Sequence, residues 1–477
     1  MPVAGRVAGA QAVGGGKRVA VSGYHQRLHG RHIAARLGGA GHLRRHGRPR
    51  VHPGHLRLPA RVPALACQTA ATARPNRRQR HAEMSAPALS ELRALYVHIP
   101  FCERKCEYCD FASIAGKRAE TVYTQALLAE IRMLGQRFPG VTLETVFFGG
   151  GTPSFIEPAL LAGVLDEVRS VFSIAPGAEV TLEANPSSTS RERAEQWLGA
   201  GFNRVSLGVQ SLEADVLRFL GRVHEARRAV DAVGEVREAG FGSVNCDLIY
   251  AVPRLGDARW RRTVQRVVAA APDHVSCYEL TVEPGTPLHV AVARGDVTPV
   301  SGSRALRQHR IAIDELAAAG YAQYEVSNFA RPGAECRHNL VYWTGGYYLG
   351  AGVGAHGHVP AAAAPALAAP ADETAVAIRY WHGRGIAAYV RAVEANLLPL
   401  QGTEVISAAT REYERLMLGL RLRDGVSITE PRVRQAADAL LRRGLLEAAP
   451  GSRLRTTARG EAVLNQVALL LTEELAA

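Results

Sequence analysis

Short apolar runs alternate with amphipathic helical stretches from about residue 94, and this alternation constrains the fold more than any other feature of the chain. Such a pattern is typical of parallel strands joined by crossover helices. About six strand-helix units within residues 91–330 predict an α/β fold, a partial (β/α)6 TIM-type barrel whose ligands meet the carboxyl ends of the strands. The predicted strands are 95–99, 145–148, 179–183, 204–209, 243–250, 274–280 and 321–326, and the predicted helices are 120–137, 158–172, 190–200, 226–239, 257–270 and 303–319.

The rest of the chain divides into two further parts. Residues 331–403 are expected to complete the barrel, and the Ala/Pro tract at 360–370 is interpreted as a surface insertion or linker. Residues 404–477 predict a C-terminal winged-helix-like α+β domain. Its elements are expected as helices at 407–420, 431–443 and 458–474 and strands at 444–446 and 454–456. With 11 basic against 10 acidic residues, this domain is expected to act as a lid or packing unit rather than to bind DNA.

Basic charge is concentrated at the start of the sequence. Residues 1–82 hold 16 of the 57 Lys and Arg residues and no Asp or Glu, so 41 basic residues face 44 acidic ones in the remainder. We expect residues 1–90 to be a basic, disordered leader or the product of an over-long translation start, with Met84 as the true first residue; a targeting arm is the alternative. The near-neutral remainder predicts no nucleic-acid partner and disfavours an enzyme that modifies nucleic acid. No apolar run reaches about 18 residues, so no transmembrane segment is predicted.

Three cysteines form a C-x3-C-x2-C motif directly after the first predicted strand: Cys102, Cys106 and Cys109. Three thiolates on one loop can hold three irons of a [4Fe–4S] cube and leave the fourth iron open. A zinc knuckle or three reduced core thiols are the alternatives, but zinc prefers four ligands and no second pair follows. The remaining cysteines are scattered, and Cys246 and Cys277 lie in apolar runs. No disulfide framework is therefore expected, and a reducing cytoplasmic location is predicted.

The motif, with Tyr108 before its third cysteine, resembles that of the radical S-adenosylmethionine (SAM) family. The resemblance implies that the open iron chelates SAM and that an electron from the reduced cluster cleaves SAM to a 5′-deoxyadenosyl radical. It also implies an electron donor such as flavodoxin or ferredoxin. The predicted fold then becomes a partial radical SAM barrel.

Polar and glycine residues follow several predicted strands. Gly149, Gly150 and Gly151 come directly after the second strand, where glycine lets the backbone approach a ligand closely. Glu183, Gln210 and Asp247 are predicted at strand ends, although each could instead make a structural hydrogen bond. Asp247 is flanked by apolar residues and would otherwise be buried without a partner. Arg222 could bind a carboxylate or be an exposed helix-end residue.

Seven segments together resemble the HemW-type branch of the oxygen-independent coproporphyrinogen III oxidase-like group: 98–102, 106–111, 148–154, 183–186, 208–211, 247–250 and 336–343. The true oxidase carries a fourth cysteine two residues after the third, and here that position is Phe111. Ala251 departs from the glycine that the group has there. The resemblance implies a heme chaperone that delivers heme to acceptor proteins, without coproporphyrinogen oxidase activity; the oxidase itself is the alternative. It implies SAM contacts from Tyr96, Tyr108, Gly149, Gly150, Gly151, Thr152, Glu183, Gln210, Arg222 and Asp247.

A histidine and two aromatic residues near position 340 suggest a heme site. His338 could be an axial ligand, and Tyr342 and Trp343 could offer flat apolar surface to a porphyrin, with Asn339 beside them. The alternative is that His338 and Asn339 are satisfied by backbone groups while the aromatics belong to the core. Cys336 and the pair His356 and His358 are further candidate ligands.

Overall fold

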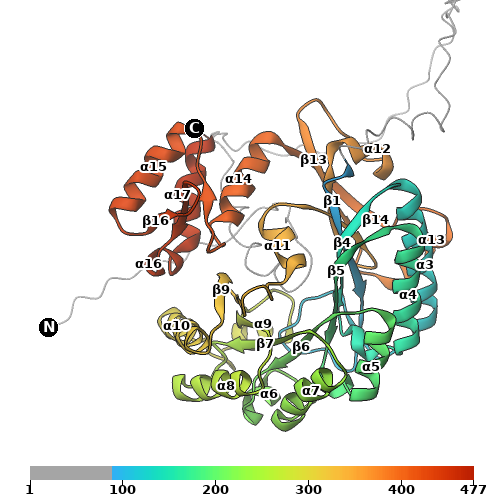
Figure 1. Cartoon of the computed structure of the whole chain (residues 1–477), viewed down its shortest axis with the longest axis horizontal. Coiled ribbons are helices and arrows are strands. Elements are labelled where there is room, and N and C mark those ends of the chain that lie inside the picture. The colour runs from blue at the N-terminus through green and yellow to red at the C-terminus, as the bar shows by residue number, and fades with distance from the viewer. Residues whose placement is uncertain (1–88, 477) are drawn as a thin grey trace, which may run out of the picture. The chain divides into compact units, whose positions relative to one another are not determined.

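A computed structural model describes residues 89–476 of the chain. Its main sheet has twelve strands in this described part, in the order β14-β13-β12-β11-β1-β4-β5-β6-β7-β8-β10-β9 (Figure 1). The strands from β11 to β8 run parallel. This confirms the prediction for β1 and β4 to β8, whereas β11 was not predicted. The bounds of these parallel strands are β1 (Leu92–Ile99), β4 (Thr142–Gly150), β5 (Ser173–Ala184), β6 (Arg204–Gln210), β7 (Ser243–Tyr250), β8 (His274–Glu279) and β11 (Tyr347–Ala351).

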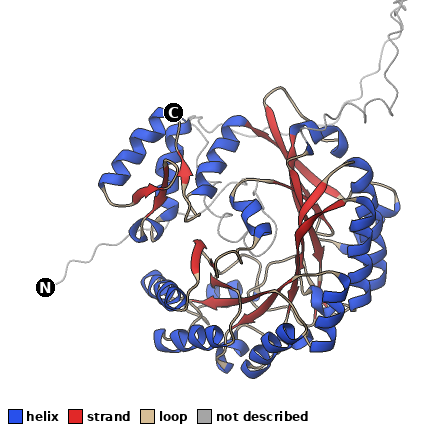
Figure 2. Cartoon of the chain, in the orientation of Figure 1, coloured by secondary structure: helices blue, strands red, loops and turns tan. Residues whose placement is uncertain are grey.

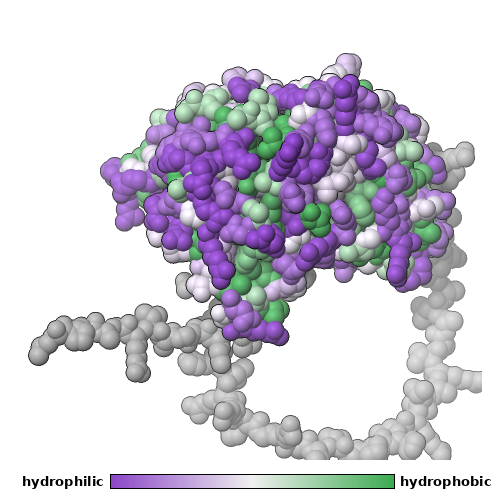
Figure 3. Space-filling model, turned by 90° about the horizontal axis from the view of Figure 1, so that it is seen from below, coloured by the Kyte–Doolittle hydropathy of each residue, from purple (hydrophilic) through white to green (hydrophobic). Residues whose placement is uncertain are grey.

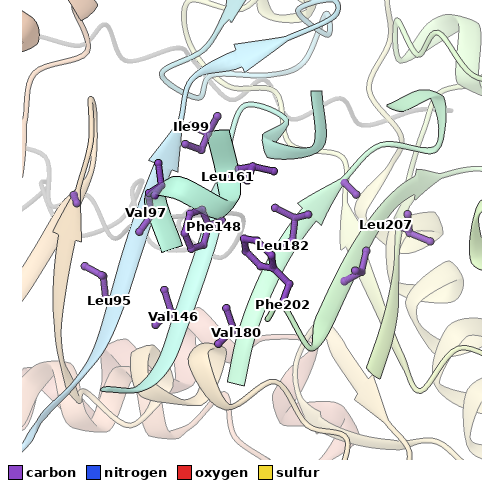
Figure 4. Packing of buried hydrophobic residues seen from close by; sticks show 14 of the residues in the cluster. Leu95, Val97, Ile99, Val146, Phe148, Leu161, Val180, Leu182, Phe202 and Leu207 are labelled. Atoms are coloured by element: carbon purple, nitrogen blue, oxygen red, sulfur yellow. The ribbon is translucent and has the colours of Figure 1, made fainter. Parts of the chain in front are cut away.

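Alternation along each parallel strand separates an apolar outer face from a polar inner face. Val146 and Phe148 on β4, like Leu182 on β5, belong to a buried apolar cluster shared with the helices (Figure 4). The neighbouring residues along the same strands, Phe147 on β4 and Glu183 on β5, line an interior pocket instead. Since successive side chains of a strand point to opposite faces, one sequence pattern builds both the core and the pocket wall.

Helices cover the outer face of the parallel strands (Figure 2). Figure 1 shows α3, α4 and α5 beside β1, β4 and β5, with α11 on the inner side of the sheet. The six predicted helices are confirmed to within one residue at each end. The helices up to α11 and the short 3-10 turns are α3 (Glu120–Arg137), η2 (Pro153–Phe155), α4 (Pro158–Val171), η3 (Pro186–Ser188), α5 (Arg191–Ala200), α6 (Ala214–Phe219), α7 (Ala226–Glu238), α8 (Asp257–Ala269), α9 (Pro287–Arg294), α10 (Gly302–Ala318) and α11 (Arg337–Trp343).

Both edges of the sheet are antiparallel, which the sequence did not predict. The strand expected at 321–326 is β9 (Ala322–Glu325), and it pairs antiparallel with β10 (Asn328–Ala330) rather than continuing the parallel barrel. The connection between them has two residues, too few for the crossover that parallel pairing requires. At the other edge β11 pairs antiparallel with β12, followed by β13 and β14. These strands are β12 (His356–Pro360), β13 (Ala375–His382) and β14 (Leu400–Ser407), and α13 (Ile386–Glu394) connects the last two.

The Ala/Pro tract is part of the core, so its interpretation as a surface insertion or linker is wrong. It forms η4 (Ala361–Ala363) and α12 (Ala364–Leu367), and η4 contacts β13. The side chains of Ala363, Ala364, Ala366 and Leu367 are buried in the main apolar cluster. Small side chains allow this close approach of the backbone to the sheet.

The C-terminal residues form a separate small core with a three-stranded sheet in the order β15-β17-β16. The order of elements is winged-helix-like, with one more strand than expected and a last helix that is interrupted after Glu461. The main sheet runs through Ser407, three residues past the predicted boundary at 404. The bounds are α14 (Ala408–Gly419), β15 (Val426–Ser427), α15 (Pro431–Arg442), β16 (Leu446–Ala449), β17 (Arg453–Thr456), α16 (Ala458–Glu461) and α17 (Leu464–Ala476).

No helix among residues 89–476 is long and apolar enough to span a membrane. Figure 3 shows one face of the molecule, on which hydrophilic side chains predominate and apolar ones form smaller patches between them. The predicted leader lies outside the described residues, apart from its last two positions.

Candidate iron–sulfur and cofactor site

The cysteine loop lies at the carboxyl ends of β1 and β4. β1 is followed by β2 (Phe101–Cys102), which pairs with β3 (Ile114–Ala115), and the loop connects these two short strands. The Gly151 N–H donates to the carbonyl of Ile99 at 2.8 Å, and the Thr152 N–H donates to that of Phe101 at 2.8 Å. The prediction that the three cysteines sit at this end of the strands is thereby confirmed.

At two of the three glycines, a larger side chain would collide with neighbouring parts of the protein. A Cβ on Gly151 would lie 2.8 Å from the backbone of Pro100 and Phe101. Gly150 has a φ of 110°, and a Cβ there would lie 2.4 Å from the His98 ring. Glycine at these positions lets the end of β4 approach the start of the cysteine loop.

The sulfurs of Cys102 and Cys106 each accept a hydrogen bond from a neighbouring side chain. Thr152 Oγ1 donates to Cys102 Sγ at 3.6 Å, and Arg222 Nη1 donates to Cys106 Sγ at 3.5 Å. Burial is the main cause that raises the pKa of the Cys102 thiol to about 11; the hydrogen bond from Thr152 opposes this rise, and the neighbouring Cys109 and Cys106 add to it. A metal must displace such a proton, and donors aimed at the sulfurs stabilise the thiolates that result.

These features fit an iron–sulfur cluster held by three thiolates. Among the described residues, no three His, Cys, Asp or Glu side chains are grouped around a single metal position. A cube differs from such a site because each thiolate binds its own iron.

Arg222 and Gln210 lie around the cysteine loop rather than in the pocket. The Arg222 guanidinium donates to the carbonyl of Gly208 at 2.9 Å and to Asn185 Oδ1. Gln210, the last residue of β6, has a φ of 61°, and its Nε2 would meet a Cβ on Gly208 at 2.9 Å. Asn185 is a residue that sequence reasoning missed. It lies in segment 183–186 of the resemblance, two residues after the third predicted strand, but no role was predicted for it.

The interior pocket brings together three of the predicted SAM contacts: Tyr96, Glu183 and Asp247. The Gly150 N–H donates to Glu183 Oε2 at 3.1 Å, which ties the glycine segment to this pocket. Tyr108 lies elsewhere, buried in the main apolar cluster. The complete lining is Tyr96, Phe147, Glu183, Arg204, Ser206, Asn245, Asp247, His274, Ser276, Tyr278, Asn328, Cys336, His338, Asn339 and Tyr342.

Asp247 has protein partners, as the alternative of a structural hydrogen bond expects, so its burial alone does not require a ligand. Ser206 Oγ donates to Asp247 Oδ2 at 3.0 Å, and Asn245 Nδ2 donates to Oδ1 at 2.9 Å. Burial raises the pKa of Asp247, while these hydrogen bonds oppose the shift. Asp247 also lies three residues before the end of β7, deeper in the barrel than predicted.

The predicted heme motif forms α11, near the amino-terminal parts of the strands. His338 Nδ1 lies 2.8 Å from Thr145 Oγ1, and its Nε2 lies 2.9 Å from the Tyr342 hydroxyl. The imidazole also stacks on Phe147, with the ring centroids 5.1 Å apart. Both ring nitrogens are therefore engaged by the protein, but by side chains rather than by the backbone groups that the alternative interpretation of this motif expects.

Glu179 of β5 holds the start of α11. Its carboxylate accepts the N–H groups of Arg337 and His338, each at 3.0 Å, and the thiol of Cys336 at 3.4 Å. Burial raises the pKa of Cys336 to about 12. Because an isolated helix of seven residues is unstable, α11 depends on such contacts for its position.

The four predicted heme residues are all buried. His338, Asn339, Tyr342 and Trp343 expose 7% or less of their surface, and Asn339 donates to the Tyr324 hydroxyl at 3.0 Å. Tyr342 lines the interior pocket, and Trp343 exposes 2% of its surface.

The other candidate heme ligands on β12 also contact the protein: His356 is partly buried and stacks on Trp381. His358 Nδ1 lies 3.1 Å from the carbonyl of Gly346, and its Nε2 lies 3.3 Å from Arg411. Burial lowers the pKa of both His356 and His358 to about 3. Both imidazoles are therefore neutral at neutral pH, the form in which histidine binds a metal.

Comparison with known proteins agrees with these observations. The radical SAM superfamily model matches residues 96–267. The chain is 39% identical to "Heme chaperone HemW" of Mycobacterium tuberculosis (strain H37Rv) over 389 residues, covering 80% of this chain and 95% of the relative. It is 34% identical to "Heme chaperone HemW" of Synechocystis over 357 residues, covering 72% and 82%.

The structure of coproporphyrinogen III oxidase (HemN) from Escherichia coli has a similar fold. Its TM-score is 0.68 at 21% identity, with coverage of 82% of this chain and 92% of that chain. The extent and identity of the HemW matches show that this chain belongs to the heme chaperone HemW family within the radical SAM superfamily.

Proposed function

We propose that this chain is a radical SAM heme chaperone, which binds heme and delivers it to heme-accepting proteins. The observation that carries the proposal is the HemW match, which extends over 95% of the M. tuberculosis relative. Phe111 supports it, since it stands where the resemblance places the fourth cysteine of the oxidase. Fold alone supports no particular activity, because one fold serves several chemistries.

The proposed cofactor site has two parts. Cys102, Cys106 and Cys109 would hold a [4Fe–4S] cluster, which supplies an electron for SAM cleavage when both are bound. The SAM contacts would come from Gly149–Thr152, Gln210 and Arg222 beside the cysteine loop and from Tyr96, Glu183 and Asp247 in the pocket. A flavodoxin or ferredoxin would supply the electron.

Heme binding at α11 would require a local rearrangement. Coordination of iron by His338 means that its imidazole gives up either Thr145 or Tyr342, because each ring nitrogen is already engaged. Exposure of Tyr342 and Trp343 to a porphyrin likewise requires α11 to leave its buried position. We therefore propose that heme binding displaces α11 from β4.

Anaerobic titration with heme tests this proposal in the full chain. Wild-type protein should develop a saturable heme absorbance band, and His338→Ala should weaken or shift it while the iron–sulfur cluster is retained. His309→Ala is the matched control, because His309 is also buried and its Nε2 lies 2.9 Å from the Val326 carbonyl and 3.9 Å from Glu461 rather than near a residue of α11. A wild-type protein without saturable heme binding would contradict the chaperone proposal. An unchanged spectrum in His338→Ala would instead move the ligand to Cys336, His356 or His358.

Oxidative decarboxylation of coproporphyrinogen III is the second candidate function. It arises from the resemblance of the sequence motifs to the oxygen-independent coproporphyrinogen III oxidase-like group. Phe111 in place of the oxidase's fourth cysteine argues against it, so we propose that this activity is absent.

A further inference from the structure

A continuous chain of side-chain contacts connects two of the three motif cysteines. Thr152 donates to the sulfur of Cys102, and Arg222 donates to that of Cys106. Asn185 lies between these two donors. Its Nδ2 donates to Thr152 Oγ1 at 3.1 Å, and its Oδ1 accepts from Arg222. The chain thus runs from Cys102 through Thr152, Asn185 and Arg222 to Cys106.

The direction of each hydrogen bond follows from the chemistry of the groups. A guanidinium has donors only, so the carboxamide must turn its oxygen to Arg222 and its NH2 to Thr152. Thr152 then accepts from Asn185, and its single hydroxyl proton is left for Cys102. Asparagine supplies both a donor and an acceptor at this point, which neither alanine nor aspartate can do.

The backbone holds Asn185 firmly in this position. The residue follows the end of β5, and its N–H donates to Ser154 Oγ at 3.0 Å. Its carbonyl accepts from Ser188 Oγ at 3.2 Å and from Thr189 Oγ1 at 2.8 Å. With its backbone bonded on both sides, the carboxamide is directed between Thr152 and Arg222 rather than toward solvent.

We propose that Asn185 is a positioning residue for the iron–sulfur cluster: it orients the Thr152 and Arg222 donors toward the sulfurs of Cys102 and Cys106. Hydrogen bonds to cluster sulfurs and nearby positive charge favour the reduced, more negative cluster. Asn185 therefore helps to set the reduction potential and the retention of iron. This inference rests on the proposed cluster.

Substitution of Asn185 in the anaerobically reconstituted full chain tests this inference. Asn185→Ala removes both contacts. Asn185→Asp keeps an acceptor for Arg222 but loses the donor to Thr152 and adds a negative charge. Both variants should have a more negative midpoint potential by spectroelectrochemical titration. A tenfold change in the one-electron reduction equilibrium corresponds to about 59 mV. Both should also release iron to a chelator faster than wild type.

Asn203→Ala is the matched control, because Asn203 also makes two side-chain hydrogen bonds, to Val180 and Ala178, but contacts no cysteine. It should keep the wild-type potential. If Asn185→Ala fails to fold, the potential and iron release of the near-isosteric Asn185→Asp test the inference by themselves. A wild-type potential and iron release rate in Asn185→Asp, or in both variants, would overturn the inference. A wild-type chain that holds no cluster would instead contradict the proposed function.

Discussion

At the scale of single residues, polar side chains have two roles: some bond to one another in the pocket, and others donate to the cysteine sulfurs. Polar residues on the inner face of the sheet bond to one another in the pocket, as Asp247 does with Ser206 and Asn245. Polar residues above the strand ends point at the cysteine sulfurs, as Thr152 and Arg222 do. Burial without such partners would cost each group several kcal/mol, by a rough estimate.

Removal of one motif cysteine should abolish the cluster. Cys106→Ala leaves two thiolates for the cube, so the reconstituted variant should lose most of its iron and sulfide and the associated visible absorbance. Cys277→Ala is the matched control, because Cys277 is buried in the apolar core and should retain the full cluster. Four irons and four sulfides per chain in a triple variant of Cys102, Cys106 and Cys109 to Ala would contradict the assignment.

The sequence predicts those site residues that belong to a motif of recognisable residue types and spacing. The spacing of the cysteines and the glycine triplet identify the loop without any structure. Asn185 could not be assigned a role, because its partners Thr152 and Arg222 lie 33 and 37 positions away along the chain. Contacts of this kind depend on the register of neighbouring strands, which periodicity does not fix.

At the scale of elements, hydrophobic periodicity predicted most of the parallel strands and their helices closely. It did not predict the parallel strand β11 or the antiparallel strands β12, β13 and β14. Of these, β12 has a single branched apolar residue, whereas β13 and β14 each contain Val and Ile that were not interpreted as strands. The Ala/Pro tract was misinterpreted as well. Composition suggests a linker, whereas burial depends on the surface that the tract meets.

Loss of the Glu179 carboxylate should loosen α11. Glu179→Ala leaves the N–H groups of Arg337 and His338 without their acceptor, which should lower the free energy of unfolding by about 1–3 kcal/mol. Urea unfolding monitored by circular dichroism measures this. Glu144→Ala is the control, since Glu144 makes exposed ion pairs that contribute about 0–1 kcal/mol. Equal stability of the two variants would show that Glu179 does not hold the helix.

The contact between β9 and the C-terminal domain should depend on pH. Burial raises the pKa of Glu325 to about 7, and hydrogen bonds from Asn328, Ser327 and Asn339 oppose this shift. The charged groups that face it are Glu461 and Arg421. Between the unfolded pKa and the folded pKa, Glu325 therefore keeps its proton in the folded protein and loses it in the unfolded chain.

The stabilising contribution of protonated Glu325 is present below its unfolded pKa of about 4.3 and is lost as the pH rises through about 7. Glu325→Gln should flatten this part of the pH dependence, by about 1.4 kcal/mol for each pKa unit of the shift. Urea midpoints between pH 5 and 8 measure the difference between the two proteins. Parallel pH profiles would contradict the prediction.

At the scale of the whole molecule, the cysteine loop and α11 occupy opposite ends of the same parallel strands. The pocket between them is lined by residues from both the predicted SAM site and α11, such as Glu183 and His338. One pocket therefore borders both the cofactor side and α11. The C-terminal domain contacts the same region, since the Arg423 N–H donates to the carbonyl of Tyr324 at 3.0 Å.

A chain that begins at Met84 should fold and bind the cluster as the full chain does. Residues 1–82 combine many Gly, Ala and basic residues with little apolar surface that could offset the entropy of ordering. Iron content, thermal unfolding and heme titration of the two chains should agree. A lower solubility or cluster content after truncation would show that the leader contributes to the working protein.

The central claim is that this radical SAM protein binds heme and does not decarboxylate coproporphyrinogen III. The most direct measurement follows tetrapyrrole products by chromatography, with reconstituted and reduced protein, SAM and coproporphyrinogen III under anaerobic conditions. A parallel sample contains heme in place of coproporphyrinogen. We predict saturable heme binding and no protoporphyrinogen. Steady formation of protoporphyrinogen would contradict the account and identify the chain as an oxidase.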